Sequence, residues 1–182
     1  LPRGLDAVVT YAATADLGVA VLAMGMAPIQ DTNLAAQHLT YRALACATLW
    51  VASRVLAKCF GSDDLRPLAG AFRRAPLTLS AILLAGLSLA GLPPMAGFAS
   101  RTVILGMTTL SPLWSLVWAL SALSPAWGIA RVVVASWGPT PPPGSRREPI
   151  WLALLLLIFA LALLLLGILP GLSFWLQTLL MG

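Results

Sequence analysis

The segment Gly91-Leu92-Pro93-Pro94-Met95-Ala96-Gly97 interrupts one of the long apolar runs of this sequence. Proline lacks a backbone N–H and its ring clashes with the preceding helical turn, so two consecutive prolines between glycines break a helix. Apolar residues nevertheless continue on both sides, from Pro76 to Leu110. The sequence therefore predicts one long hydrophobic element that is helical at both ends and broken at 91–97.

The rest of the chain has the composition of a membrane protein. Of its 182 residues, 59% are hydrophobic and 9% are charged, and the mean hydropathy is +0.92. Soluble domains carry about 45–50% apolar and about 25% charged residues. This composition excludes a soluble fold and a disordered chain, because apolar runs of this length have to be buried, and lipid is where they are buried most readily.

Apolar runs of about 20 residues, the length that crosses a bilayer as a helix, recur along the chain. They predict an all-α, polytopic membrane helix bundle that forms a single domain over residues 1–182. The expected helices cover about 7–27, 34–57, 76–110, 113–137 and 150–180. The segment 138–149 is rich in proline and cannot be helical throughout.

The positions of Lys and Arg indicate whether the run 76–110 crosses the membrane once or twice. With one crossing, Arg3, the basic segment 58–74 and the pair Arg146-Arg147 lie on the same side, and the opposite loops contain neither Lys nor Arg. Cytoplasmic loops of membrane proteins show this excess of basic residues. We therefore expect five crossings with the third one discontinuous, the N-terminus inside and the C-terminus outside.

A charge inside a membrane helix costs about 2.5–3.5 kcal/mol on insertion scales. Arg54 and Arg131 lie within two turns of basic loops and can extend to the membrane surface, but four further residues lie deeper in the expected helices. They are Asp16 in the first helix, His38 and Arg42 in the second, and Arg101 just after the break. The spacing of His38 and Arg42 places them on one helix face, and Cys46 and Trp50 continue this stripe.

Paired with one another, these four side chains would form a buried polar line across the bundle. Because histidine exchanges a proton near neutral pH, and a neighbouring cation can tune an aspartate, such a line can relay protons. Because arginine does not deprotonate in proteins, the same residues can also form a static cluster that fixes the register of the helices. Spacing alone leaves both interpretations open.

The string Ala90-Gly91-Leu92-Pro93-Pro94-Met95-Ala96-Gly97-Phe98, with Arg101 shortly after it, is joined by the segments Thr10–Gly18 and His38–Cys46. Together they resemble the antiporter-like proton-translocating subunits of respiratory complex I and their relatives in membrane-bound hydrogenases and Mrp-type antiporters. The resemblance implies a fourteen-helix subunit built from two inverted five-helix repeats. This chain would cover roughly its last five helices, including the second broken one.

The resemblance also assigns roles to single residues. It places Arg101 where the family has a protonatable Lys or Glu, and it matches His38 to the first histidine of the connecting helix. Three positions depart from the family pattern, namely Asp16, Arg42 and Cys46, where the family has His or Gln, His, and Lys respectively.

Three functions are compatible with this resemblance. The first is a membrane subunit, or the C-terminal part of one, in an energy-converting oxidoreductase complex of the NADH:quinone oxidoreductase type, where the polar line takes part in proton translocation. The second is a degenerate subunit that serves only as a scaffold in a respiratory or photosynthetic complex, since Arg101 cannot release a proton. The third is an ion or bicarbonate transporter subunit.

The expected partners are other integral membrane subunits and lipid, because a polar stripe on a five-helix bundle needs a partner bundle. The sequence has no motif for a redox cofactor and no cluster of metal ligands, so electron transfer would belong to partner subunits. Membrane orientation accounts for the net charge of +5, and neither nucleic acid nor a soluble small-molecule substrate is expected. The expected location is an energy-transducing membrane, foremost the bacterial inner membrane.

Overall fold

The computed structural model describes residues 4–26, 32–107, 112–138, 141 and 143–169. Every secondary-structure element in these ranges is a helix. They are α1 (Leu5–Met26), α2 (Thr32–Phe60), the short 3-10 helix η1 (Arg66–Leu68), α3 (Ala71–Arg74), α4 (Pro76–Ala90), α5 (Ala96–Met107), α6 (Pro112–Ser136) and α7 (Ile150–Ile168). The predicted all-α, polytopic bundle is confirmed.

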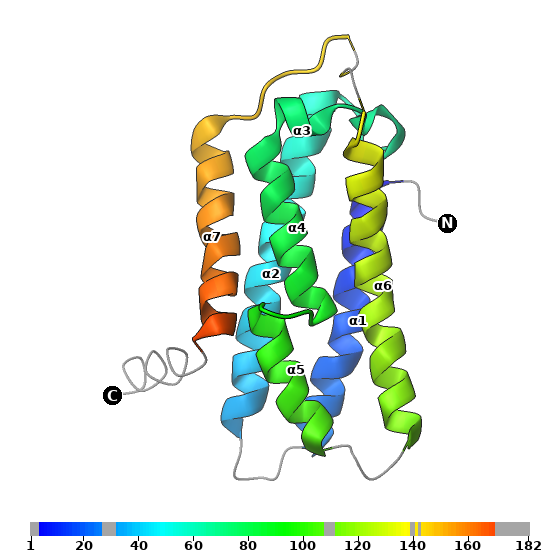
Figure 1. Ribbon diagram of the computed structural model, residues 1–182, viewed down its shortest axis with the longest axis vertical. Coiled ribbons are helices and arrows are strands. Elements are labelled where there is room, and N and C mark those ends of the chain that lie inside the picture. Colours follow the sequence, from blue (N-terminus) through cyan, green and yellow to red (C-terminus); the bar gives the residue numbers. More distant parts are fainter. Residues whose placement is uncertain (1–3, 27–31, 108–111, 139–140, 142, 170–182) are drawn as a thin grey trace.

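Several of these helices are suited to a membrane. Three of them contain segments long and apolar enough to span it, Ala36–Phe60 in α2, Ala119–Ser136 in α6 and Ile150–Ile168 in α7. Helix α4 is apolar but shorter than these three. Figure 1 shows that α5 follows the C-terminal end of α4 and continues along the bundle in the same general direction. With 15 residues α4 rises only about 22 Å, less than the roughly 30 Å of a hydrocarbon core. The break between α4 and α5 therefore falls inside the apolar part of the bundle.

The bounds of the helices differ a little from those expected from sequence. Helices α1 and α2 begin at 5 and 32 rather than 7 and 34, and α2 continues to 60 rather than 57. The expected element 76–110 contains both α4 and α5, and its residues 108–110 lie outside the described ranges. Helix α7 is described up to 168, so most of the expected extension to 180 also lies outside them.

Helix α4 occupies the centre of the bundle and packs against α2, α6 and α7, while α1 packs against α2 and α6 (Figure 1). A helix that is surrounded on several sides has to be apolar around most of its circumference. The small residues Ala81, Ala85 and Gly86 are buried in α4 and let the neighbouring helices approach closely. At Gly86 a methyl group would overlap the Ile129 side chain of α6. Because α4 is central, the break at its end lies in the middle of the bundle.

The first turn of α4 is capped by a residue far away in the sequence. The Glu148 carboxylate accepts hydrogen bonds from the backbone N–H groups of Leu77 (3.1 Å) and Thr78 (2.9 Å) and from the Thr78 hydroxyl (2.7 Å). A negative charge is favourable at a helix N-terminus, where the first N–H groups have no partner within the helix. Glu148 therefore anchors the segment before α7 to the start of α4.

We expect the Glu148→Ala substitution to lower the free energy of unfolding by about 1–2 kcal/mol, because it leaves the two N–H groups without their acceptor. Glu148→Gln should recover part of this loss, since an amide oxygen still accepts one hydrogen bond. Thermal unfolding of the detergent-purified protein measures both, with Asp64→Ala, at an exposed carboxylate, as the control. A Glu148→Ala variant as stable as the control would contradict the capping role.

The end of α4 is a regular helix stop that depends on glycine. Gly91 adopts the left-handed conformation (φ 68°, ψ 40°), which costs glycine little because it has no side chain. Its N–H donates to the Ser88 carbonyl, and the N–H of Leu92 donates to the Leu87 carbonyl, both at 3.1 Å. This pair of bonds is the Schellman motif, which ends many helices.

The chain then turns once and starts the next helix. The N–H of Met95 donates to the Leu92 carbonyl at 3.1 Å, which closes a turn with Pro93 and Pro94 in its middle. Helix α5 begins directly afterwards at Ala96. The helix is therefore interrupted between Ala90 and Ala96, where Gly91, Pro93 and Pro94 lie, whereas Gly97, which was expected in the break, already belongs to α5.

Candidate functional site at the helix break

A cluster of charged side chains lies next to the break between α4 and α5. It combines the four residues singled out from sequence, Asp16 from α1, His38 and Arg42 from α2, and Arg101 from α5. Asp16, His38 and Arg101 are 2–3% exposed, whereas the Arg42 side chain is 20% exposed. The cluster is thus buried where helices from three parts of the chain meet.

The Asp16 carboxylate is the centre of this cluster. Its Oδ1 accepts a hydrogen bond of 2.6 Å from Nη2 of Arg101. Its Oδ2 lies 3.5 Å from Nε of Arg42 and 3.9 Å from Nε2 of His38. One carboxylate therefore faces two guanidinium groups, and the buried cluster carries a net positive charge even when His38 is neutral. Burying such a set is costly unless its hydrogen bonds are satisfied.

Arg101 connects the cluster to the broken helix. Its Nη1 donates to the carbonyl of Ala90, the last residue of α4, at 3.2 Å. A methyl group at Gly91 would overlap the aliphatic part of the Arg101 side chain, so glycine also makes room for it. Backbone groups freed by a break need partners inside a membrane protein. Arg101 supplies one of these partners while it also binds Asp16.

On the other side of the break, a serine of α4 supports the first turn of α5. The N–H of Gly97 donates to the Ser88 hydroxyl at 3.2 Å. Helix α5 comes so close to α4 here that a methyl group at Gly97 would overlap the Ser88 carbonyl oxygen. The close contact between α4 and α5 therefore requires glycine at position 97.

His38 is fixed in orientation by α5. Its Nδ1 lies 2.9 Å from the Ser100 hydroxyl oxygen, and this hydroxyl donates to the Gly97 carbonyl at 3.3 Å. Because a hydroxyl has a single proton, both contacts are made together when Nδ1–H of His38 donates to Ser100. The opposite nitrogen, Nε2, then presents a lone pair toward Asp16. It is buried and has no hydrogen-bond partner among the described residues.

The predicted stripe along α2 holds only at its start. His38 is buried and Arg42, whose Nη2 also donates to the Ala13 carbonyl at 2.9 Å, is half-buried. Trp50 is 57% exposed, and its ring instead lies against the Arg54 guanidinium, 5.8 Å from the ring centroid. The prediction for Trp50 was wrong because each step of four residues rotates about 40° around a helix of 3.6 residues per turn. Three such steps turn the stripe away from the cluster.

Sequence reasoning did not include Ser88 and Ser100 in the site. Both are buried, and both lie close to the break in sequence. Buried hydroxyls within a turn or two of a helix break are candidates for binding the freed backbone groups. Among the described residues, no group of three or more His, Cys, Asp or Glu side chains is arranged to hold a metal ion.

A family described as "NADH:quinone oxidoreductase/Mrp antiporter, TM" matches this chain over residues 5–124, a range that contains the whole charged cluster and the break. The chain belongs to this family. The resemblance inferred from the sequence motifs is therefore confirmed, and the chain is an antiporter-like membrane protein.

Individual relatives agree with this assignment. The chain is 35% identical over 118 residues to NADH-quinone oxidoreductase subunit N of Geobacillus sp. (strain WCH70), covering 62% of this chain and 24% of the relative. It is 29% identical over 124 residues to NADH-ubiquinone oxidoreductase chain 5 of Pelomedusa subrufa, covering 68% of this chain and 20% of the relative. The matched part thus spans about a fifth to a quarter of these curated relatives.

A solved structure shares the fold. A chain of respiratory complex I from Thermus thermophilus, in a structure with bound Aureothin, superposes with a TM-score of 0.61 at 21% sequence identity. The match covers 91% of this chain and 44% of the other. The fold of the bundle described above therefore corresponds to less than half of that longer chain.

Proposed function

We propose that this chain is the broken-helix part of an antiporter-like subunit that translocates protons in an NADH:quinone oxidoreductase-type complex. The observation that carries this proposal is the buried Asp16 carboxylate, held between Arg101 and Arg42 with His38 Nε2 at 3.9 Å. A structural ion pair needs only one cation for one carboxylate. A second guanidinium, and a histidine whose Nε2 has no hydrogen-bond partner in the part of the chain that the structure describes, are groups that a proton path uses.

Asp16 and His38 are the groups that can exchange the proton, and Arg42 and Arg101 set the electrostatic field, because guanidinium groups stay charged. A proton that reaches Nε2 of His38 creates an imidazolium that attracts the Asp16 carboxylate. This attraction competes with the bond between Asp16 and Arg101. When the proton leaves toward the next carrier, the carboxylate returns to Arg101, and the cycle can repeat.

The assembly proposed for the chain follows from its surface. Exposed apolar side chains cover the outer faces of α6 and α7, including Leu113 (71%) and Trp151 (84%). In a membrane these faces contact lipid or other integral subunits. We place the N-terminus and the basic loops on the inside of an energy-transducing membrane and the C-terminus outside. Two observations support this orientation: the 58–74 segment and the loop before α7 lie at one end of the bundle, and both are basic (Figure 1).

A scaffold without transport is the second candidate, and the bonding of Arg101 favours it. The guanidinium is buried and bonded to both Asp16 and the Ala90 carbonyl. A residue fixed in this way at the position of the family's protonatable Lys or Glu can hold α1 to the break without moving a proton.

The substitution His38→Gln separates the two candidates. Glutamine can keep a hydrogen bond to Ser100 but cannot exchange a proton, so we expect proton translocation through this subunit to fall at least about tenfold. The measurement is NADH-driven proton uptake into everted membrane vesicles, normalised to the amount of assembled complex. Thr40→Val, at an exposed position of the same helix, is the control. Unchanged uptake at normal assembly would leave only the scaffold.

A further inference from the structure

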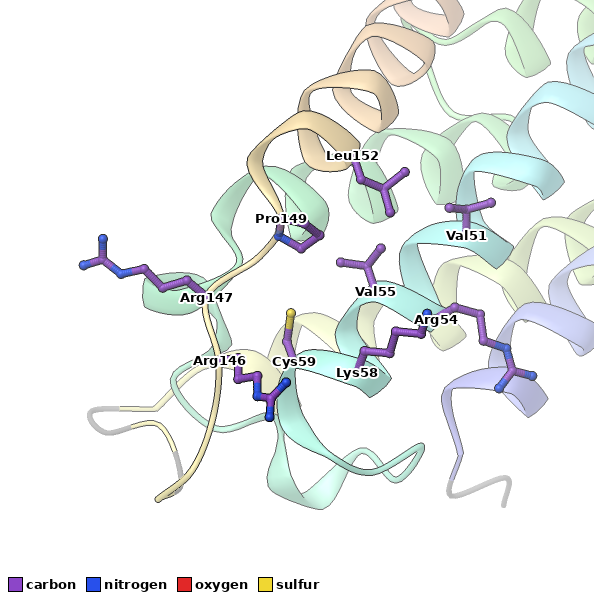
Figure 2. Close-up of a pocket in the computed structure, with 9 residues that line it drawn as sticks. All are labelled: Val51, Arg54, Val55, Lys58, Cys59, Arg146, Arg147, Pro149 and Leu152. Atoms are coloured by element: carbon purple, nitrogen blue, oxygen red, sulfur yellow. The ribbon is translucent and has the colours of Figure 1, made fainter.

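A second polar site lies at the opposite end of α2, away from the charged cluster. It is a pocket of about 320 Å³ between the end of α2, the segment 146–149 and the start of α7. Figure 2 shows Lys58 and Cys59 from α2 and Arg146 from the segment before α7 around it. The backbone holds the two parts together, since the N–H of Arg146 donates to the Cys59 carbonyl at 2.8 Å. The pocket is therefore part of the fold, because this bond fixes its two walls relative to each other.

The pocket has a surplus of positive charge. Of the four basic residues that line it, Arg54 is paired with Asp6 and Asp63, at 2.5 and 3.6 Å. Lys58 and Arg146 form no ion pair with any residue that the structure describes. The neighbouring carboxylate, Glu148, binds the start of α4 instead. Arg147 likewise has no ion pair among the described residues, so three cations are left that could bind an anion.

Figure 2 separates the roles of the basic residues. The Arg147 side chain extends away from the other labelled residues, and the Arg54 guanidinium points toward the opposite side of the view. Lys58 and Arg146 lie closer to the centre, on either side of Cys59. We therefore assign the anion to Lys58 and Arg146.

The remaining wall of the pocket is apolar. Val51 and Val55 come from α2 and Leu152 from α7, and both helices contain segments suited to span a membrane. Lys58 lies near the end of the first of these segments, and Arg146 lies shortly before the start of the second. The pocket is therefore basic at the membrane surface and continues as an apolar seam toward the hydrocarbon core.

We propose that this pocket binds an anionic phospholipid, with its phosphate between Lys58 and Arg146 and an acyl chain along the seam between α2 and α7. Basic pockets between membrane helices at the surface recognise such headgroups. A soluble anion would use only the basic half of the pocket. The lipid would link α2 to α7, two helices that are separated by about half of the chain.

The test uses the full protein in its complex and a phosphatidylglycerol that carries a photoreactive diazirine in one acyl chain. Crosslinks mapped by mass spectrometry should fall on peptides that contain Val51, Val55 or Leu152. In Lys58→Gln/Arg146→Gln the half-saturating lipid concentration should rise about 25-fold, roughly a factor of five for each removed charge. The matched control is Arg66→Gln/Arg73→Gln, which removes two exposed arginines of the same end outside this pocket. Lys58→Arg/Arg146→Lys keeps both charges and should keep the binding.

Three results would overturn the proposal. Equal labelling by a photoreactive phosphatidylcholine would show an apolar groove without recognition of the headgroup charge. Competition by inorganic phosphate would indicate a site for a soluble anion. Absence of crosslinks at these peptides in the wild-type complex would mean that protein covers the pocket. If the double variant does not assemble, the single Arg146→Gln substitution is expected to weaken binding about fivefold.

Discussion

The Asp16→Asn variant is expected to lose about 3–5 kcal/mol of stability, the cost of removing one partner from a buried ion pair. The asparagine oxygen can still accept one hydrogen bond from Arg101. It carries no charge, however, so the buried guanidinium of Arg101 and the half-buried guanidinium of Arg42 would remain without a counter-ion. Since Asp16 and Arg101 are almost completely buried, water cannot compensate for this loss. We expect little of the variant to accumulate in assembled form.

The amount of assembled subunit and its unfolding temperature measure this effect. Asp64→Asn, the same substitution at an exposed position, should change neither. The double variant Asp16→Asn/Arg101→Gln should be more stable than Asp16→Asn alone, because it also removes one of the unpaired charges. A double variant as unstable as the sum of its single variants would show that the two residues do not depend on each other.

The Gly97→Ala substitution is the second change with a large expected effect. The added methyl group would overlap the Ser88 carbonyl oxygen and lie 2.8 Å from the carbonyl carbon. Because these are backbone atoms of α4, a side-chain rotation cannot relieve the clash, and α5 has to move. We expect a loss near the upper end of the 1–3 kcal/mol typical of overpacking. The movement would also shift Ser100 and Arg101 away from His38 and Asp16, so proton uptake should fall in whatever complex still assembles.

Gly18→Ala is the matched control for this prediction. Gly18 lies within α1, and a methyl group there meets nothing within 4 Å. Alanine favours the helix over glycine, so the control should be as stable as the wild type or slightly more stable. Both variants are compared by the unfolding temperature and by vesicle proton uptake. If Gly97→Ala behaves like Gly18→Ala, the close contact between α4 and α5 is not required.

The broken helix could be predicted from sequence because its cause is local. Consecutive prolines next to Gly91 prevent a continuous helix whatever surrounds them. The positions of Asp16, His38 and Arg101 in apolar segments were equally informative about the site, because ionisable side chains inside a membrane usually pair with one another. For this reason the sequence could indicate which residues meet before the arrangement of the helices was known.

The contacts between distant segments could not be predicted in the same way. Glu148 caps α4 from a position about seventy residues away, and nothing in the local sequence around it specifies this partner. The pocket at Lys58 and Arg146 depends on how α2 and α7 pack, which is decided by side-chain shape rather than by pattern. The register of Trp50 was mispredicted because a four-residue spacing was extended beyond the two turns over which it stays on one face.

The Arg101 side chain joins two helices that are far apart in the sequence, since it binds the last carbonyl of α4 and the carboxylate of α1 at the same time. The break and α1 are therefore mechanically coupled through one side chain. A neighbouring subunit that pushed on α1 would displace the end of α4 without touching it. A force on α1 would reach the discontinuity through this linkage as well as through the direct packing of α1 against α4, and a shorter side chain at position 101 would remove the first of these two routes.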